Sequence, residues 1–420
     1  MSINLVKLKL EDILARFDSN EKHVIVITRT TKNGWQPMLA WNPIDILAIP
    51  YDDVSDPTER LELFMTQQKN AGRLVIGYLS YDVGCILHNV TLHTQDDLRT
   101  PLAYVMGFAN WISFDAATSS VHAGSDSFED EIAHIMARPF TKIPLKMYRK
   151  GLSPSWSQES YNQAYARVHD YIEAGDIYQA NLTHRLEGTT DVRGIDIFRK
   201  VSADSHADFQ SYIGGDNFEI ISASPERFVR IADGTIQTMP VKGTRGRGAN
   251  RGKDNLLRRD LETSLKDKAE LDMITDLMRN DLGMISKIGS VKVVERRVLT
   301  KYPTLWHAHS EIRATLRDDI SPIAALISLM PGGSITGCPK KRAIEIIDKV
   351  EATRRGVYTG SIFTINPSGE LDSNIAIRTM IKKSDKIYLS VGGGVVYDST
   401  QIQEYKESLQ KAASFLHIDS

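Results

Sequence analysis

Apolar and polar residues follow one another along the chain with two different periods, which predicts a mixture of strands and helices. Continuous apolar runs at residues 24–28 and 74–81 are typical of buried strands. Asp56-Pro57-Thr58 begins a pattern that predicts a helix to about Asn70, with Gly72 as its stop. A second helix is expected between the capping residue Ser157 and Gly175, because apolar side chains recur there at helical spacing.

The stretch 113–128 is small and polar and predicts a loop or a solvated hairpin. We place a boundary after it and before Gly151. It divides the chain into an N-terminal α+β half, residues 1–145, and a second region, residues 146–420. Hairpins outnumber strand–helix–strand units, which favours an α+β fold with antiparallel sheets.

Asp233-Gly234 is a strong hairpin signal between two strand-like runs, 224–231 and 235–242. A two-residue loop would place Glu226 opposite Val241, one step from Lys242. A carboxyl and an amine at the same end of a hairpin suit a general acid beside a nucleophile. Taken alone, these residues fit a surface ion pair at least as well.

Further polar residues fall on predicted elements of the second region. A strand at 176–185 carries Gln179 on one face, and a strand at 375–380 holds Arg378 among apolar residues, where it needs an anion. The glycine-rich stretch 331–340 leads into a helix and could present backbone N–H groups to an anion. A strand at 387–391 runs into three consecutive glycines, which either form a bulge or let a ligand approach the backbone.

Two predicted helices each carry a pair of acids three residues apart, and so on one side. Asp267 and Glu270 lie on a helix from about Ser264 to Asn280, stopped by Gly283. Glu404 and Glu407 lie on a helix from about Thr400 to Leu416, whose expected apolar stripe is Ile402, Tyr405, Leu409, Ala412 and Leu416. Together with the arginine and the lysine hairpin, these acids indicate a pocket for a small polyanion and a divalent metal such as Mg²⁺.

Composition limits the function classes. The 420 residues are 41% hydrophobic and 25% charged, with a net charge of −2, so no basic excess points to nucleic acid or anionic lipid. No run of about eighteen apolar residues predicts a membrane span. Two cysteines cannot form a disulfide framework, and residues 1–7 lack the apolar core of a signal peptide, so we expect a cytoplasmic protein.

These motifs together resemble the chorismate-utilising enzyme family, over residues 150–420 and in the family's order. The matching stretches are Gly175-Asp176-Ile177-Tyr178-Gln179-Ala180-Asn181-Leu182, Ala223-Ser224-Pro225-Glu226-Arg227-Phe228, Pro240-Val241-Lys242-Gly243-Thr244-Arg245, Asp267-Lys268-Ala269-Glu270, Arg279-Asn280-Asp281-Leu282-Gly283, Pro331-Gly332-Gly333-Ser334-Ile335-Thr336-Gly337, Tyr358-Thr359-Gly360-Ser361-Ile362, Asn374-Ile375-Ala376-Ile377-Arg378-Thr379 and Gly392-Gly393-Gly394. The resemblance implies a large two-layer antiparallel β-sandwich flanked by helices, with the active site between its sheets.

The resemblance also implies roles for individual residues. Glu270 and Glu407 would bind Mg²⁺, supported by Asp267 and Glu404, and Glu226 would be the general acid. The substrate-binding set implied for chorismate is Gly243, Thr244, His307, Ser334, Tyr358, Arg378, Gly392, Gly393, Gly394 and Gln179.

Lys242 favours the branch of the family that forms 4-amino-4-deoxychorismate on the way to p-aminobenzoate and folate, because anthranilate-forming members usually have alanine there. Gln179 stands where water-using members carry a lysine, which argues against water as the nucleophile. Lys242 would form a covalent intermediate, and ammonia would come from a separate glutamine amidotransferase subunit, since neither cysteine lies in a glutaminase nucleophile turn. The alternatives are an anthranilate synthase component I and a degenerate chorismate-binding protein.

Overall fold

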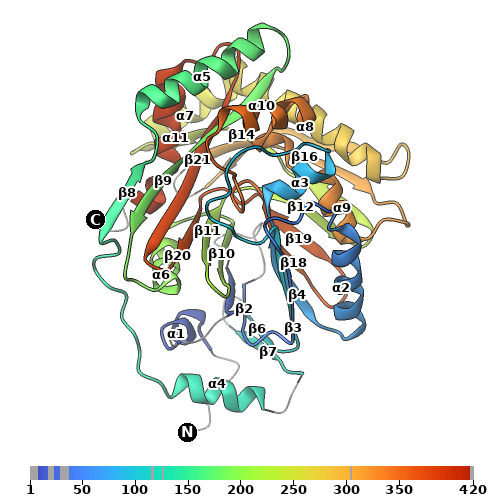
Figure 1. Cartoon of the computed structure of the whole chain (residues 1–420), viewed down its shortest axis with the longest axis vertical. Coiled ribbons are helices and arrows are strands. Elements are labelled where there is room, and N and C mark those ends of the chain that lie inside the picture. The colour runs from blue at the N-terminus through green and yellow to red at the C-terminus, as the bar shows by residue number, and fades with distance from the viewer. Residues whose placement is uncertain are drawn as a thin grey trace.

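The computed structural model describes residues 8–17, 23–28, 37–114, 118–124, 127–302 and 305–416. Its strands form two large antiparallel sheets that face each other, with helices on the outer sides (Figure 1). The predicted α+β class and the two-layer sandwich are therefore confirmed. The signal-peptide interpretation concerns residues 1–7, which lie outside the described residues.

Among the described residues, the first sheet has 11 strands. In spatial order these are β17 (Gly337–Cys338), β9 (Gln179–Thr189), β21 (Lys386–Val395), β20 (Thr379–Lys383), β11 (Glu219–Ser224), β10 (Phe209–Gly214), β1 (Ile25–Thr28), β2 (Met38–Ala40), β6 (Trp111–Phe114) and β7 (Ser119–His122), with β8 (Lys150–Pro154) also paired to β9.

The second sheet has 10 strands within the same described part of the chain. Its order is β14 (Val241–Gly246), β16 (Leu305–Thr315), β13 (Thr235–Thr238), β12 (Arg227–Ala232), β19 (Leu371–Asn374), β18 (Ser361–Ile365), β4 (Leu74–Leu79), β5 (Ala103–Phe108) and β3 (Asp45–Ile49), with β15 (Lys292–Lys301) paired to β16. Both sheets contain strands from residues 1–145 and from residues 146–420.

The helices cover the outer faces and the ends of the sandwich. They are α1 (Leu10–Leu14), α2 (Thr58–Asn70), α3 (Tyr81–Leu87), α4 (Phe128–Met136), α5 (Gln158–Glu173), α6 (Gly194–Asp204), α7 (Arg251–Thr263), α8 (Leu265–Ile285), α9 (Pro322–Leu329), α10 (Lys340–Val350), α11 (Gln401–Lys411) and α12 (Ala413–Leu416), with a 3-10 turn, η2, at Gly333–Ile335. Of the helices described, none is long and apolar enough to span a bilayer.

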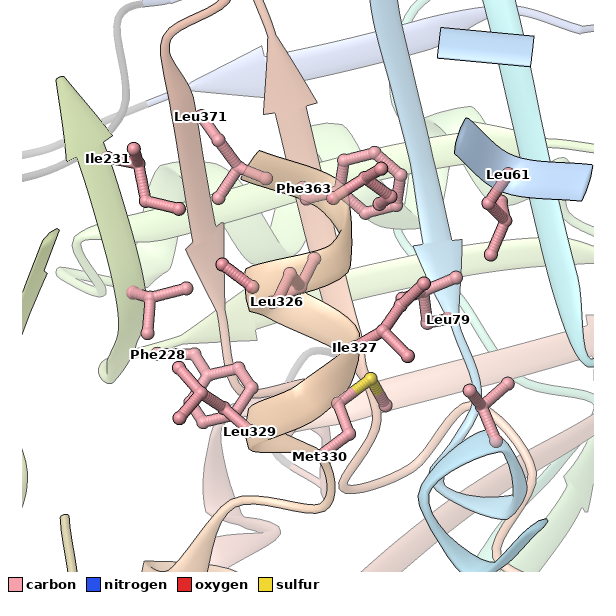
Figure 2. Close-up of a cluster of buried hydrophobic side chains, with 14 of the residues drawn as sticks. Leu61, Leu79, Phe228, Ile231, Leu326, Ile327, Leu329, Met330, Phe363 and Leu371 are labelled. Atoms are coloured by element: carbon pink, nitrogen blue, oxygen red, sulfur yellow. The ribbon is translucent and has the colours of Figure 1, made fainter. Parts of the chain in front are cut away.

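Apolar side chains fill both the space between the sheets and the outer face of the second sheet. Between the sheets, one cluster joins β1 and β10 to β4 and β5 through residues such as Ile27 and Ile76. On the outer face, Leu326 and Leu329 of α9, and Met330 just after it, pack against side chains of β12, β18, β19 and β4 (Figure 2). Because burial of each such side chain contributes roughly 1.5–3 kcal/mol, these layers hold the site-bearing strands in place.

Local sequence signals identified several elements correctly. Helices α2 and α5 span the predicted ranges, and the Ser157 hydroxyl caps α5 by accepting a hydrogen bond from the Ser160 N–H. The 113–128 stretch contains the β6–β7 hairpin, although residues 115–117 and 125–126 lie outside the described residues. The hairpin of β12 and β13 has the predicted two-residue loop, with Arg230 paired to Gln237. The predicted pairing of Glu226 with Val241 is wrong, because β13 ends at Thr238 and Val241 begins β14, where it pairs with His309 of β16.

Some predicted boundaries are wrong. Helix α8 runs through Gly283 to Ile285, because Gly283 does not adopt the positive φ by which a glycine ends a helix. Ile402 is 51% exposed and does not belong to the apolar stripe, whereas Tyr405, Leu409, Ala412 and Leu416 pack against buried clusters as predicted. Glu404 and Ser408 of α11 are buried as well. The apolar run 74–81 is a strand only to Leu79 and then begins α3.

The largest error concerns residues 375–380, predicted as one strand. The return strand β19 ends at Asn374, and β20 begins at Thr379 in the other sheet. Ile375–Arg378 form the connection between the sheets, with Arg378 at φ +50°, outside the range of a strand. Apolar side chains are buried there because the connection crosses the interior of the sandwich.

A second connection runs beside the first. The chain leaves the first sheet at Ser224 and enters the second at Arg227, so Pro225 and Glu226 cross between the layers. The Ile375 N–H donates to the Glu226 carbonyl at 3.1 Å, and the Ser224 hydroxyl donates to the Ile375 carbonyl at 2.6 Å. The two crossings are thus hydrogen-bonded together, which brings Glu226 and Arg378 to the same end of the sandwich.

Candidate active site

A cavity of about 630 Å³ lies at these crossings. Its walls come from the two crossings, from β14, β16 and β21, and from helices α8 and α11. Fourteen of the sixteen predicted site residues line it: Glu226, Lys242, Gly243, Thr244, Asp267, Glu270, His307, Ser334, Tyr358, Arg378, Gly392, Gly394, Glu404 and Glu407. Gln179 and Gly393 lie behind the wall, and the individual roles of all sixteen stay predictions.

Lys242 enters the cavity from a bulge in β14. The register between β14 and β16 shifts between Val241 and Thr244, which is where Lys242 and Gly243 sit. Gly243 has φ +86°, and a side chain there would come within 2.8 Å of Leu261 and 3.1 Å of Asp267. Within the described residues, the Lys242 side chain has no hydrogen bond or ion pair, so its nitrogen is available to a ligand.

Glu226 lies buried at the crossing of the two layers, with 7% of its surface exposed. Burial raises the pKa of Glu226 to about 7, against the opposing effects of the Ser334 hydroxyl and the charge of Lys242. The Ser334 hydroxyl donates to one carboxylate oxygen at 2.7 Å. A carboxyl that keeps its proton up to neutral pH can act as a general acid.

Four carboxylates face the cavity from the two helices, as their spacing predicts. Burial raises the pKa of Glu270 and of Glu404, and each is raised further by the neighbouring charge of Glu407. Oxygen donors of this kind fit Mg²⁺. Among the described residues, however, no three His, Cys, Asp or Glu side chains lie close enough together to hold a metal ion as they stand.

A basic side chain lies near each of these acids, and two of the basic residues, Lys266 and Lys411, were not among the predicted site residues. Lys266 lies 4.0 Å from Glu270 and 3.9 Å from Glu404, and Lys411 lies 3.0 Å from Glu407. The i,i+4 spacing of Lys266 with Glu270 and of Glu407 with Lys411 was the available signal. Arg245 pairs with Asp267 at 2.9 Å, so this acid has a cation partner as well.

The opposite wall suits an anion. Arg378 is largely enclosed, and burial lowers its pKa. No side-chain partner of Arg378 occurs among the residues that the structure describes, so its charge is free for a ligand. His307 donates to or accepts from the Thr244 hydroxyl at 2.8 Å, and burial lowers the pKa of His307 to about 4, which keeps the ring neutral. Burial raises the pKa of Tyr358 to about 12, so its hydroxyl is protonated.

The glycine run in β21 lets other groups approach its backbone closely. A side chain at Gly394 would come within 2.7 Å of the Gln179 amide nitrogen and 3.5 Å of the Lys242 amine nitrogen. Gln179 is fully buried, and neither its amide oxygen nor its amide nitrogen has a partner in the described structure. Gly393 faces the other way, where a side chain would come within 2.9 Å of Glu404.

Comparisons with known proteins agree with this geometry. The family model for chorismate binding enzymes matches residues 25–417. This chain belongs to the chorismate binding enzyme family. The match begins in β1, so it covers strands of the N-terminal region as well as the cavity.

Individual relatives carry two different names. Component 1 of aminodeoxychorismate synthase from Bacillus subtilis is 33% identical over 351 residues, covering 80% of this chain and 75% of that protein. Component 1 of anthranilate synthase from Lactococcus lactis is 30% identical over 412 residues, covering 91% of this chain and 90% of that protein. The fold matches the crystal structure of anthranilate synthase component I from Streptococcus pneumoniae over the full length of both chains, with a TM-score of 0.81 and 24% identity.

Proposed function

We propose that this chain is the chorismate-converting component of an aminodeoxychorismate synthase, which makes 4-amino-4-deoxychorismate from chorismate and ammonia. The observation that carries the proposal is the pair formed by Lys242, which has no hydrogen bond or ion pair within 4 Å in the described structure, and Glu226, a buried acid, in one cavity. Relatives named for this activity support it, such as the Klebsiella aerogenes protein, which is 35% identical over 344 residues. Relatives named for anthranilate synthesis are as similar, so Lys242 is the deciding feature.

Chorismate is a dianion, and the two walls of the cavity suit its two carboxylates. Arg378, Tyr358 and the backbone of Gly392 and Gly394 would bind the enolpyruvyl carboxylate. The ring carboxylate would face α8 and α11, where a bound Mg²⁺ held by Glu270 and Glu407, with Asp267 and Glu404 in support, would neutralise its charge. Neutral His307, held by Thr244, would border the ring.

Lys242 and Glu226 would then divide a difficult substitution into two steps, because hydroxide is a poor leaving group. In the first, the uncharged Lys242 amine forms a bond to ring C2, both ring double bonds shift, and the 4-hydroxyl leaves as water with the proton of Glu226. In the second, ammonia adds at C4, the double bonds shift back, and the bond from C2 to the Lys242 nitrogen breaks. The proton lost from the incoming nitrogen restores Glu226.

Intact-protein mass spectrometry tests this proposal. Protein incubated with chorismate and Mg²⁺ in the absence of ammonia should gain the mass of chorismate less water, on the peptide that contains Lys242. Lys242→Ala should show no adduct, whereas Lys253→Ala, on the exposed surface of α7, should still form it. A wild-type protein that makes 4-amino-4-deoxychorismate at full rate with no adduct would leave Lys242 only an electrostatic role.

The same incubation, supplied with ammonium, separates this function from the second candidate. Anthranilate has a characteristic fluorescence and mass, and its appearance as the main product would assign the chain to anthranilate synthesis. No product of either kind would favour the degenerate binding protein. We further propose a glutamine amidotransferase subunit as the ammonia source, in keeping with the "component 1" names of the relatives.

A further inference from the structure

The four acids on α8 and α11 are neutralised by the chain's own basic side chains. Arg245 forms an ion pair with Asp267, and Lys411 forms one with Glu407, so each of these two basic residues pairs with one acid of the four. Lys266 differs from both, because its ammonium lies within 4.0 Å of Glu270 and 3.9 Å of Glu404. Among the ion pairs of the described residues, that of Lys266 therefore joins an acid of α8 to an acid of α11.

The exposure of the three side chains is unequal. The side chain of Glu404 is 5% exposed and that of Glu270 is 17% exposed, whereas that of Lys266 is 49% exposed. An enclosed carboxylate needs a positive partner, but a half-exposed ammonium can be solvated by water instead. Glu404 also accepts a hydrogen bond from the Ser399 hydroxyl at 2.8 Å, and the charge of Lys242 acts on Glu270, so Lys266 is one of several supports of these acids. Lys266 can therefore leave at small cost.

We infer that Lys266 is an exchangeable internal cation, which neutralises Glu270 and Glu404 in the metal-free protein and leaves them when a divalent metal ion binds. This inference rests on the proposed function, which assigns the metal to the same acids. Two like charges cannot share the space between these carboxylates without strong repulsion. Lys266 should therefore weaken metal binding and stabilise the metal-free state.

Isothermal titration calorimetry with MgCl₂ alone tests the inference on the full-length chain. Lys266→Met removes the charge and keeps most of the side-chain length, and it should lower the Kd for Mg²⁺ about tenfold, equivalent to about 1.4 kcal/mol. Lys266→Arg should bind Mg²⁺ like the wild type. Lys268→Met is the matched control, because Lys268 is an exposed lysine of the same helix that does not line the cavity, and its Kd should not change.

Thermal unfolding gives a second readout. Without metal, Lys266→Met should melt at a lower temperature than the wild type, because Glu270 and Glu404 lose their counter-charge. With saturating Mg²⁺ the difference should shrink, so the metal-induced rise in Tm should be larger in the variant. Glu407→Gln should reduce the binding heat in either background, which ties the heat to this site.

The possible results distinguish the role of Lys266 from the existence of the metal site. Equal Kd values for wild type and Lys266→Met, or weaker binding by the variant, would overturn the inference and leave the metal site standing. If neither protein binds Mg²⁺, and Glu407→Gln behaves as both do, the metal site itself falls and Lys266 is a permanent structural cation.

Discussion

The carboxyl of Glu226 should make the protein less stable at the pH where the proposed reaction runs. Its pKa is about 7 in the folded chain, against an ordinary value of 4.5. The folded state therefore holds its proton more tightly than the unfolded state, and stability falls as the pH rises from about 4.5 to about 7. The two pKa values differ by an amount equivalent to roughly 3 kcal/mol, fully expressed above the higher one.

Glu226→Gln removes this penalty while keeping the shape of the side chain and an oxygen that can accept the Ser334 hydrogen bond. Urea unfolding at pH 5 and at pH 8 should show that the variant gains about 2–3 kcal/mol on the wild type between these two conditions. Turnover should be lost at both pH values, because an amide cannot protonate the leaving group.

An exposed glutamate provides the control for this pH comparison. Glu159→Gln, at an exposed position in the first turn of α5, should show a nearly constant difference from the wild type at the two pH values. If the difference for Glu226→Gln were equally constant, the carboxyl would be ionised without penalty and could not be the buried acid of the mechanism.

Two further predictions concern the site and the nitrogen source. Gly394→Ala would place a methyl group 2.7 Å from the Gln179 amide and 3.5 Å from the Lys242 amine. Steady-state kinetics should show turnover reduced by roughly tenfold or more, and thermal unfolding should show a stability loss of about 1–3 kcal/mol. Wild-type values for both turnover and stability would contradict the close approach. The purified chain should use ammonium salts but not glutamine, since neither Cys85 nor Cys338 lies in a glycine-flanked nucleophile turn, and burial raises the pKa of both thiols, which disfavours the reactive thiolate. Labelled product from amide-¹⁵N glutamine with the single chain would contradict this.

Local chemistry explains which parts of the fold could be predicted. The hairpin before Lys242 was predicted in register because its turn is specified by two adjacent residues, Asp233 and Gly234, which both adopt positive φ. Helix α5 was predicted because its N-cap Ser157, its apolar face and the terminating Gly175 are all close in sequence. The acid pairs on α8 and α11 were placed correctly for the same reason, since helical spacing fixes which side chains share a face.

Long-range features could not be predicted in this way. The connection at Ile375–Arg378 resembles a strand in sequence because burial favours apolar residues in either conformation, and its crossing between sheets depends on the whole sandwich. The ion pair of Lys266 with Glu404 joins helices from distant parts of the chain. The local sequence indicated only the i,i+4 pair of Lys266 with Glu270. The link between Ser334 and Glu226 likewise depends on how η2 packs against a crossing.

The acid set of the cavity is complete only if the chain includes α11. Glu404, Glu407 and Lys411 come from α11, which follows β21 in the sequence and packs beside it in the first sheet. A chain that stopped after β21, through premature termination or proteolysis, would retain Lys242, Glu226 and Arg378 but would lack half of the acid set. Such a product would keep the proposed nucleophile but would lack two of the four acids proposed to hold the metal, so an adduct at Lys242 without Mg²⁺-dependent turnover is the expected result.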